Sequence, residues 1–174
     1  MMFQIPLVLF VTLVCVPASS PGGDKEAPKK ATKQVAGKGL PDLIAGLKAT
    51  PGCLGVETAQ TGSGKQVIFA WFEDKKAALK WFHSDVHQEL MKKFFPDHES
   101  RKPLRDVPDD SGPIMTIASL TFAKEPKFKE TSLPISQIAI ELYQPLSGGV
   151  FLGGRFAPKN LKVPKMRDYS PKNE

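Results

Sequence analysis

Hydrophobic positions recur at helical spacing in two stretches of the chain and alternate with polar positions in several shorter ones. Residues 40–49 carry apolar side chains at positions 40, 43, 44 and 47, and Thr50-Pro51-Gly52 ends the pattern. This three- and four-residue spacing predicts a helix. Residues 53–60 and 65–72 are typical of two strands, joined by a hairpin at the glycine-containing loop 61–64.

The longest helical pattern follows these strands. Residues 75–95 predict one long helix, with Asp74 as its N-cap and Pro96 helping to end it. Its apolar positions drift along one face, with His83 at the far edge of this stripe and His87 just beyond it at the polar boundary. The stripe consists of Ala78, Leu79, Phe82, Val86, Leu90 and Phe94.

The rest of the chain predicts loops and strands. Residues 96–113 form a long polar, proline-rich loop, a kind of segment that is often functional. Three strand patterns follow, at 114–122, 135–143 and 150–156. The element order predicts an α+β domain with a largely antiparallel sheet and helices on one face. Because the other face needs a cover, two copies pairing their sheets face to face across a two-fold axis would form a homodimer.

The N-terminal residues predict export. Residues 3–16 are an apolar run of signal-peptide length, shorter than a membrane span, although no Lys or Arg precedes it. We expect residues 1–18 to be a signal peptide cleaved after Ala18, with an uncleaved N-terminal anchor as the alternative. The protein is then periplasmic or secreted and keeps no stable membrane span. Cys53 would be its single thiol, so no intrachain disulfide could form.

The net charge of +6 is concentrated near the two ends of the chain. Residues 19–39 predict a disordered basic linker and residues 157–174 a basic C-terminal tail. Neither segment has the interleaved aromatic residues or the motif of a nucleic-acid-binding protein. We therefore expect solvated tails and no nucleic-acid partner.

The segment from Thr50 to Phe95 resembles a known family. It contains Pro51-Gly52 after a helix, Trp71 with Glu73 at a strand end, and Ser84-Asp85-Val86-His87 on the following helix. These residues are similar to the antibiotic-biosynthesis-monooxygenase-like (ABM) domains of the dimeric α/β-barrel, ferredoxin-like group. The resemblance covers about residues 40–123, and the whole chain resembles small exported bacterial proteins that carry such a domain. It places the ABM-like domain at 40–156, with the long loop 96–113 and extra C-terminal strands at 135–156.

The resemblance implies a function as well as a fold. It implies binding of a small apolar or aromatic molecule, with possible cofactor-independent monooxygenase activity. The alternative is a ligand-binding or dimerisation protein without catalysis. In haem-degrading members, a Trp and a His occupy the positions that fall here on Phe72 and Met91. The haem-degrading residues therefore do not carry over, and no cofactor is expected.

The family fold also opens with a central strand before the first helix, whereas the residues before Leu40 are a poor strand. We hypothesise that Ile135–Tyr143 supplies this central strand from the C-terminal side.

The candidate site lies on and around the predicted long helix. If the domain is an enzyme, His87 would act as acid/base. A ligand pocket would be lined by Trp71, Phe72, Trp81, Phe82, His83, Met91 and Phe94. Histidines four residues apart on a helix can also share a metal, with His98, Asp97 or Glu99 as a third ligand. No metal-site motif supports this, so we predict no metal and keep a structural pair at the helix boundary as the other alternative.

Overall fold

The computed structural model describes residues 42–97 and 102–171. All of them belong to one compact unit, Lys33–Glu174. The predicted signal peptide, residues 1–18, and the predicted linker, residues 19–39, lie outside the described residues. None of the helices in the described ranges is long and apolar enough to cross a membrane. The elements are α1 (Leu43–Ala49), β1 (Cys53–Gln60), β2 (Gln66–Phe72), α2 (Lys75–Phe82), α3 (Asp85–Phe94), β3 (Ile114–Phe122), β4 (Ile135–Tyr143), β5 (Val150–Phe151) and β6 (Arg167–Asp168).

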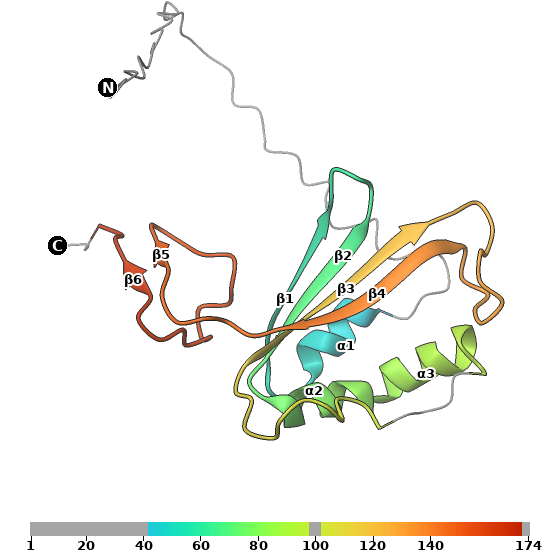
Figure 1. The fold of residues 1–174 in the computed structure, drawn as a ribbon, viewed down its shortest axis with the longest axis horizontal. Helices are drawn as coiled ribbons and strands as arrows, with labels where there is room; N and C mark the ends of the chain where they lie inside the picture. Colours follow the sequence, from blue (N-terminus) through green and yellow to red (C-terminus); the bar gives the residue numbers. More distant parts are fainter. Residues whose placement is uncertain (1–41, 98–101, 172–174) are drawn as a thin grey trace, which may run out of the picture. The chain divides into compact units, whose positions relative to one another are not determined.

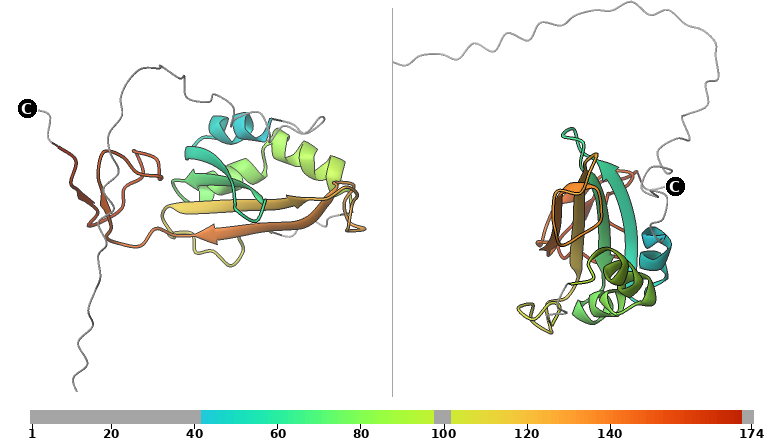
Figure 2. Two further views of the ribbon diagram at one scale, coloured as in Figure 1. Left: turned by 90° about the horizontal axis from the view of Figure 1, so that it is seen from above. Right: turned by 90° about the vertical axis from the view of Figure 1, so that its right-hand side faces the viewer.

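The four long strands form one antiparallel sheet in the order β1-β2-β3-β4 (Figure 1). The three helices gather on one side of this sheet (Figure 2). The predicted α+β, ferredoxin-like class with helices on one face is confirmed.

Alternate residues of β2 explain where the core lies. Ile68, Ala70 and Phe72 project toward the helices, because successive strand residues point to opposite faces. Phe72 has 0% of its surface exposed. Leu47 of α1 and Ala77 of α2 pack against this face. The core therefore joins β1 and β2 to the first two helices.

The opposite face of β2 is covered by the chain's own C-terminal segment, residues 152–166. The ring of Phe156 meets the rings of Phe69 and Trp71 edge-on, with centroids 4.9 Å and 5.0 Å away. Pro158 packs on Gly55 of β1, where a Cβ would lie 2.5 Å from its ring. Leu161 is buried. This part of the second face is thus occupied within a single chain.

The predicted single helix over 75–95 is wrong, because the chain breaks into α2 and α3 at His83 and Ser84. Asp74 caps α2 as predicted, with its carboxylate accepting a bond from the Ala77 N–H at 2.8 Å. His83 ends α2, and the Ser84 hydroxyl accepts a bond from the His87 N–H at 3.3 Å. A serine that caps a new helix N-terminus stabilises the break.

The hypothesis that Ile135–Tyr143 is a central strand is also wrong. Within the described residues β4 pairs with β3 alone and lies at an edge, and β3 is the inner neighbour of β2. β3 carries apolar side chains on both faces, among them Ile114, Ile117 and Leu120, and nearly all its residues are at least half-buried. β4 is mostly exposed. Inner strands are covered on both faces, which favours β3 for that place.

The strand predicted over 150–156 is limited to β5, Val150–Phe151. Gly153, whose φ is +72°, interrupts the extended backbone soon afterwards. β5 pairs in parallel with β6, which lies within the predicted basic tail. That tail therefore contributes a strand and the buried Leu161.

Candidate functional site

The break between α2 and α3 gathers the aromatic residues of the predicted helix around His87. The His87 ring lies 4.9 Å from the Phe82 ring and 5.4 Å from the Trp81 ring, measured between centroids. The ring of His83 also contacts Phe82, at 5.2 Å. We call Trp81, Phe82, His83 and His87 the His87 cluster. It brings together four of the predicted site residues.

Helix α1 packs closely against the residues of this cluster at Gly46. A Cβ on Gly46 would lie 3.2 Å from the Trp81 ring and 3.0 Å from a methyl group of Val86. Only a residue without a side chain allows α1 to approach the corner of α2 and α3 this closely. The position of Trp81 beside His87 therefore depends on close helix packing at Gly46.

His87 is the member of the cluster with distinctive chemistry. Its Nδ1 atom is buried and has no hydrogen-bond partner among the described residues. Burial lowers the pKa of the imidazole below its ordinary value of 6.5, and the carbonyl of Phe82 opposes part of this effect. The side-chain amide of Gln88 already donates to that carbonyl. Because the pKa of His87 lies below 6.5, its imidazole is mainly neutral at pH 7, and one of the two ring nitrogens is able to accept a proton.

The remaining predicted pocket residues lie elsewhere. Phe72 points into the core, whereas Trp71 points to the opposite face and meets Phe156, so the two cannot line one pocket together. Met91 and Phe94 lie on α3, which has no buried residue. Met91 borders a shallow hollow of about 430 Å³ along the outer side of α3, together with Phe95 and Lys92. Whether any of these residues contacts a ligand stays a prediction.

The metal hypothesis depends partly on residues that are not described. His98 and Glu99 lie outside the described ranges, and Asp97 is exposed just after α3. Among the described residues, no three His, Cys, Asp or Glu side chains are grouped to hold a metal ion. Cys53 is a free, half-buried thiol on β1, and burial raises its pKa. Its Sγ lies 3.7 Å from the Gly55 carbonyl.

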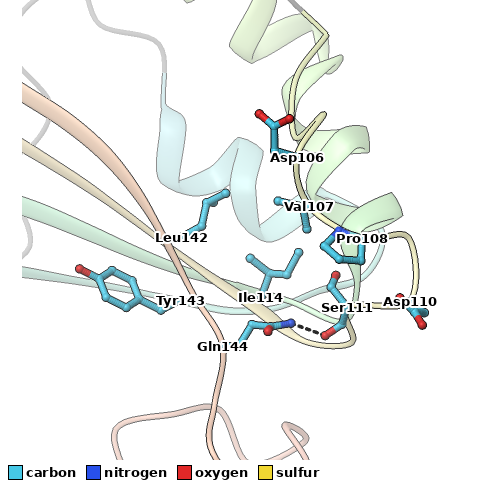
Figure 3. A pocket seen from close by; sticks show the side chains of 9 residues that line it. All are labelled: Asp106, Val107, Pro108, Asp110, Ser111, Ile114, Leu142, Tyr143 and Gln144. Atoms are coloured by element: carbon cyan, nitrogen blue, oxygen red, sulfur yellow. Dashed lines mark hydrogen bonds between the residues drawn. The ribbon is translucent and has the colours of Figure 1, made fainter.

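The structure contains a second hollow of a size for a small molecule, and none of its lining residues was predicted from the sequence as a site residue. It is a hollow of about 340 Å³ between the loop before β3 and the end of β4 (Figure 3). Val107, Ile114 and Leu142 point toward one another there, whereas the ring of Tyr143 points away from the loop (Figure 3). The residues around it are Asp106, Val107, Pro108, Asp110, Ser111, Ile114, Leu142, Tyr143 and Gln144. The unusual length of the loop 96–113 was the one sequence signal for it.

The loop that borders this hollow is held at two points. Lys75, at the start of α2, donates to the Val107 carbonyl at 2.7 Å and to the Asp109 carboxylate at 2.8 Å. The Gln144 side chain donates to the Ser111 carbonyl. The hydroxyl of Ser111 is buried and has no partner among the described residues. The hollow is thus preformed, apolar at its centre, and offers one unpaired hydroxyl.

Comparison with known proteins gives one match. Residues 27–93 match the sequence model of the family described as antibiotic biosynthesis monooxygenase. The match starts before the first described residue and ends within α3, so β3–β6 lie outside it. No curated protein and no solved structure matches the chain. ABM domains bind small molecules and often dimerise, and the match supports a small-molecule-binding protein of this type. The matched residues include α1, β1, β2, α2 and most of α3, and over this part the chain is similar to antibiotic-biosynthesis-monooxygenase domains.

Proposed function

We propose that this protein is exported and binds a small apolar or aromatic molecule at the His87 cluster. The observation that carries the proposal is the buried Nδ1 of His87, which lacks a partner while two aromatic rings lie beside the imidazole. Leaving a buried polar atom unpaired costs about 1–3 kcal/mol, and a ligand hydroxyl that bonds to it would recover this cost. The rings of Trp81 and Phe82 would pack against the apolar body of the ligand.

The same geometry supports a cofactor-independent oxidation of a phenol. A neutral His87 would accept the phenolic proton, which leaves an electron-rich phenolate. Reaction with O₂ would then place one oxygen atom in the ring, and the other would leave as water. All four electrons that reduce O₂ come from the substrate, which loses two ring hydrogens or hydroxyl protons in total and becomes a quinone, so the reaction needs no added reductant. The lowered pKa suits this role, because the imidazole is unprotonated at pH 7.

A second candidate function is binding without turnover. The hollow beside Ser111 favours it, because an apolar centre with one unpaired hydroxyl is suited to holding a small molecule. None of its lining residues is a histidine, cysteine or lysine.

Titration with 1-naphthol, followed by oxygen uptake and quinone absorbance, tests the proposal. We expect His87→Gln to abolish turnover and to weaken binding about fivefold, the effect of one lost hydrogen bond. Phe82→Ala should weaken binding, and Glu57→Gln on the exposed surface of β1 is the control that should change neither. Binding without turnover in the unmodified protein would favour the second candidate. Equal binding by unmodified protein and His87→Gln would reject the His87 cluster as the site.

Export is tested separately. Protein expressed from the full chain should be recovered outside the cytoplasm with Ser19 as its first residue. The apolar run 3–16 followed by small residues supports this. A retained Met1 in the recovered protein would contradict cleavage, and recovery in the cytoplasm would contradict export.

A further inference from the structure

The short strands β5 and β6 divide their side chains between two environments. Val150 of β5 pairs in parallel with Arg167 of β6. Paired residues of a sheet point to the same face, and successive residues of a strand point to opposite faces, so Val150 and Arg167 share one face. Leu152 and Tyr169, each two residues further along the chain, continue this face, and all four residues are exposed. We call Val150, Leu152, Arg167 and Tyr169 the outer β5–β6 face.

The opposite face of the two strands packs against the chain itself. The ring of Phe151 lies 5.9 Å from the Arg155 guanidinium, and the same guanidinium contacts the sulfur of Met166. Met166 also approaches β5 at Gly149, where a Cβ would lie 3.2 Å from its methyl group. Phe151, Arg155 and Met166 are half-buried. The arginine therefore occupies the inner face, and the outer face is turned to solvent.

The apolar side chains of the outer face are unusually open. Val150, Leu152 and Tyr169 are 67%, 69% and 60% exposed, and Leu146, just before β5, is 85% exposed. Apolar side chains gathered at such exposure indicate an interaction surface, because contact with water is unfavourable for each of them. The sequence predicted only a solvated basic tail from residue 157 onward. Pairing of β6 with β5 brings Tyr169 of this tail beside the apolar group.

Positive charge accompanies this apolar group. The exposed cations of residues 144–171 are Lys159, Lys162, Lys165 and Arg167. Asp168 is the one carboxylate of this described segment, and it accepts a bond from the Ser170 N–H at 2.8 Å. Lys165 has a φ of +58°, uncommon for a residue with a side chain, in a turn whose Pro164 carbonyl accepts a bond from the Gly148 N–H at 2.8 Å. This turn places a lysine next to the start of β5.

We propose that the outer β5–β6 face binds the surface of an anionic lipid membrane. Its apolar side chains would enter the boundary between headgroups and acyl chains, while Arg167 and Lys165 would bind lipid phosphate groups. Tyr169 suits this boundary, because its ring has an apolar body and a polar hydroxyl. The excess of positive charge favours anionic over zwitterionic lipid. The proposal does not depend on ligand binding at His87.

The small size of the face favours a membrane over an acidic protein as its partner. β5 and β6 have two residues each, whereas a stable complex between two proteins buries about 800 Å² on each partner. A lipid surface requires no matching shape. A few inserted side chains and the non-specific attraction of cations to anionic headgroups are sufficient to hold a protein there.

Flotation with lipid vesicles tests the proposal on protein expressed from the full chain. We expect binding to mixed vesicles of phosphatidylglycerol and phosphatidylcholine, and at least about tenfold weaker binding to phosphatidylcholine alone. Arg167→Glu should weaken binding to the mixed vesicles about tenfold, and Leu152→Gln about fivefold. Arg105→Glu makes the same change of charge at an exposed position outside the segment and is the control. Equal weakening by Arg167→Glu and Arg105→Glu would show that net charge alone drives binding, against the proposal.

A fluorescent label distinguishes this face from other points of attachment, such as the N-terminal residues. In a background in which Cys15 and Cys53 are replaced by serine, a polarity-sensitive dye is attached through Leu152→Cys. Ile140→Cys, at a position on β4 that is 64% exposed, is the matched control. Mixed vesicles should shift the emission at position 152 to shorter wavelength and leave that at position 140 unchanged. No shift at position 152, or equal shifts at both positions, would overturn the proposal. So would binding to polyglutamate but not to vesicles, which would indicate an acidic protein partner instead.

Discussion

At the scale of single residues, the direction of each side chain decides its role more than its chemical type. Trp71 and Phe72 are adjacent aromatic residues that are both buried, yet they serve opposite faces of the sheet. His83 and His87 both contact the Phe82 ring, but His83 is exposed while His87 buries its Nδ1. His87 is therefore the one of the two with a polar atom to satisfy.

Burial of His87 makes stability depend on pH. Because the pKa of His87 is lower in the folded protein than the ordinary 6.5, the unfolded chain binds a proton more readily. The contribution to stability is complete above about pH 6.5 and is lost as the pH falls from there toward the folded-state pKa. Urea unfolding should show a larger loss between about pH 7 and pH 5 for the unmodified protein than for His87→Gln. An equal loss in both would show that His87 is not desolvated.

Gly52, between α1 and β1, should be intolerant of any side chain. Its φ is +85°, and a Cβ would lie 2.6 Å from both the Ala77 Cβ and the Glu73 carboxylate. We expect Gly52→Ala to lower the free energy of unfolding by about 2 kcal/mol or more, from backbone strain and overpacking together. Gly62→Ala is the control, since no atom lies within 4 Å of its Cβ position. Similar losses in the two variants, measured by chemical denaturation, would contradict this reason.

At the scale of elements, local hydrogen bonds override the hydrophobic pattern at one place. The stripe from Ala78 to Phe94 is continuous enough to predict one helix, but His83 closes α2 and Ser84 opens α3. The break turns α3 away from the sheet, which is why α3 has no buried residue while α2 buries Ala77 and Ala78. It also lets the His87 ring contact both Trp81 and Phe82 of the preceding helix.

The Ser84 cap should therefore be measurable. Ser84→Ala removes the acceptor of the His87 N–H and should cost about 1 kcal/mol of stability, whereas Ser84→Asp should retain it. Thermal unfolding checks the stability of both variants. Far-ultraviolet circular dichroism checks whether helix content rises in Ser84→Ala. A rise would mean that the two helices merge and that the serine alone specifies the break.

At the scale of the whole molecule, the C-terminal segment joins the fold through one arginine. The Arg155 guanidinium donates to the carbonyls of Pro158, Lys159 and Leu161 and contacts the Met166 sulfur. Next to it, Phe156 touches the rings of Phe69 and Trp71 on the sheet. The arginine thus shapes a segment with few strand hydrogen bonds of its own.

Loss of Arg155 should loosen this segment from the sheet. We expect proteolysis between Gln144 and Ser170 to become at least about tenfold faster in Arg155→Ala, since local opening then costs less. Arg155→Lys should not rescue it, because one ammonium group cannot replace a planar fork with several donors. Arg105→Ala removes an exposed arginine paired with Asp106 and is the control. If Arg155→Lys resisted cleavage as the unmodified protein does, positive charge alone would hold the segment.

The sequence by itself determined most of the local elements and the resemblance to a known family. Periodicity placed α1, β1, β2, β3 and β4 close to their observed bounds, because each has a clear apolar face or a turn at its end. Pro51-Gly52, Trp71 and Ser84-Asp85-Val86-His87 pointed to the family that residues 27–93 match. These signals are local, so they can be read along the chain.

Only the tertiary structure decided which strands are neighbours, where the helix breaks, and which aromatic residues meet. Ile114–Phe122 and Ile135–Tyr143 both alternate well enough for an inner strand, and packing on both faces selected the first. The unpaired Nδ1 of His87 and the hollow beside Ser111 depend on contacts between residues far apart in the chain. Such contacts leave no periodic signal, because strand order and burial are set by the competition of all apolar faces for one core.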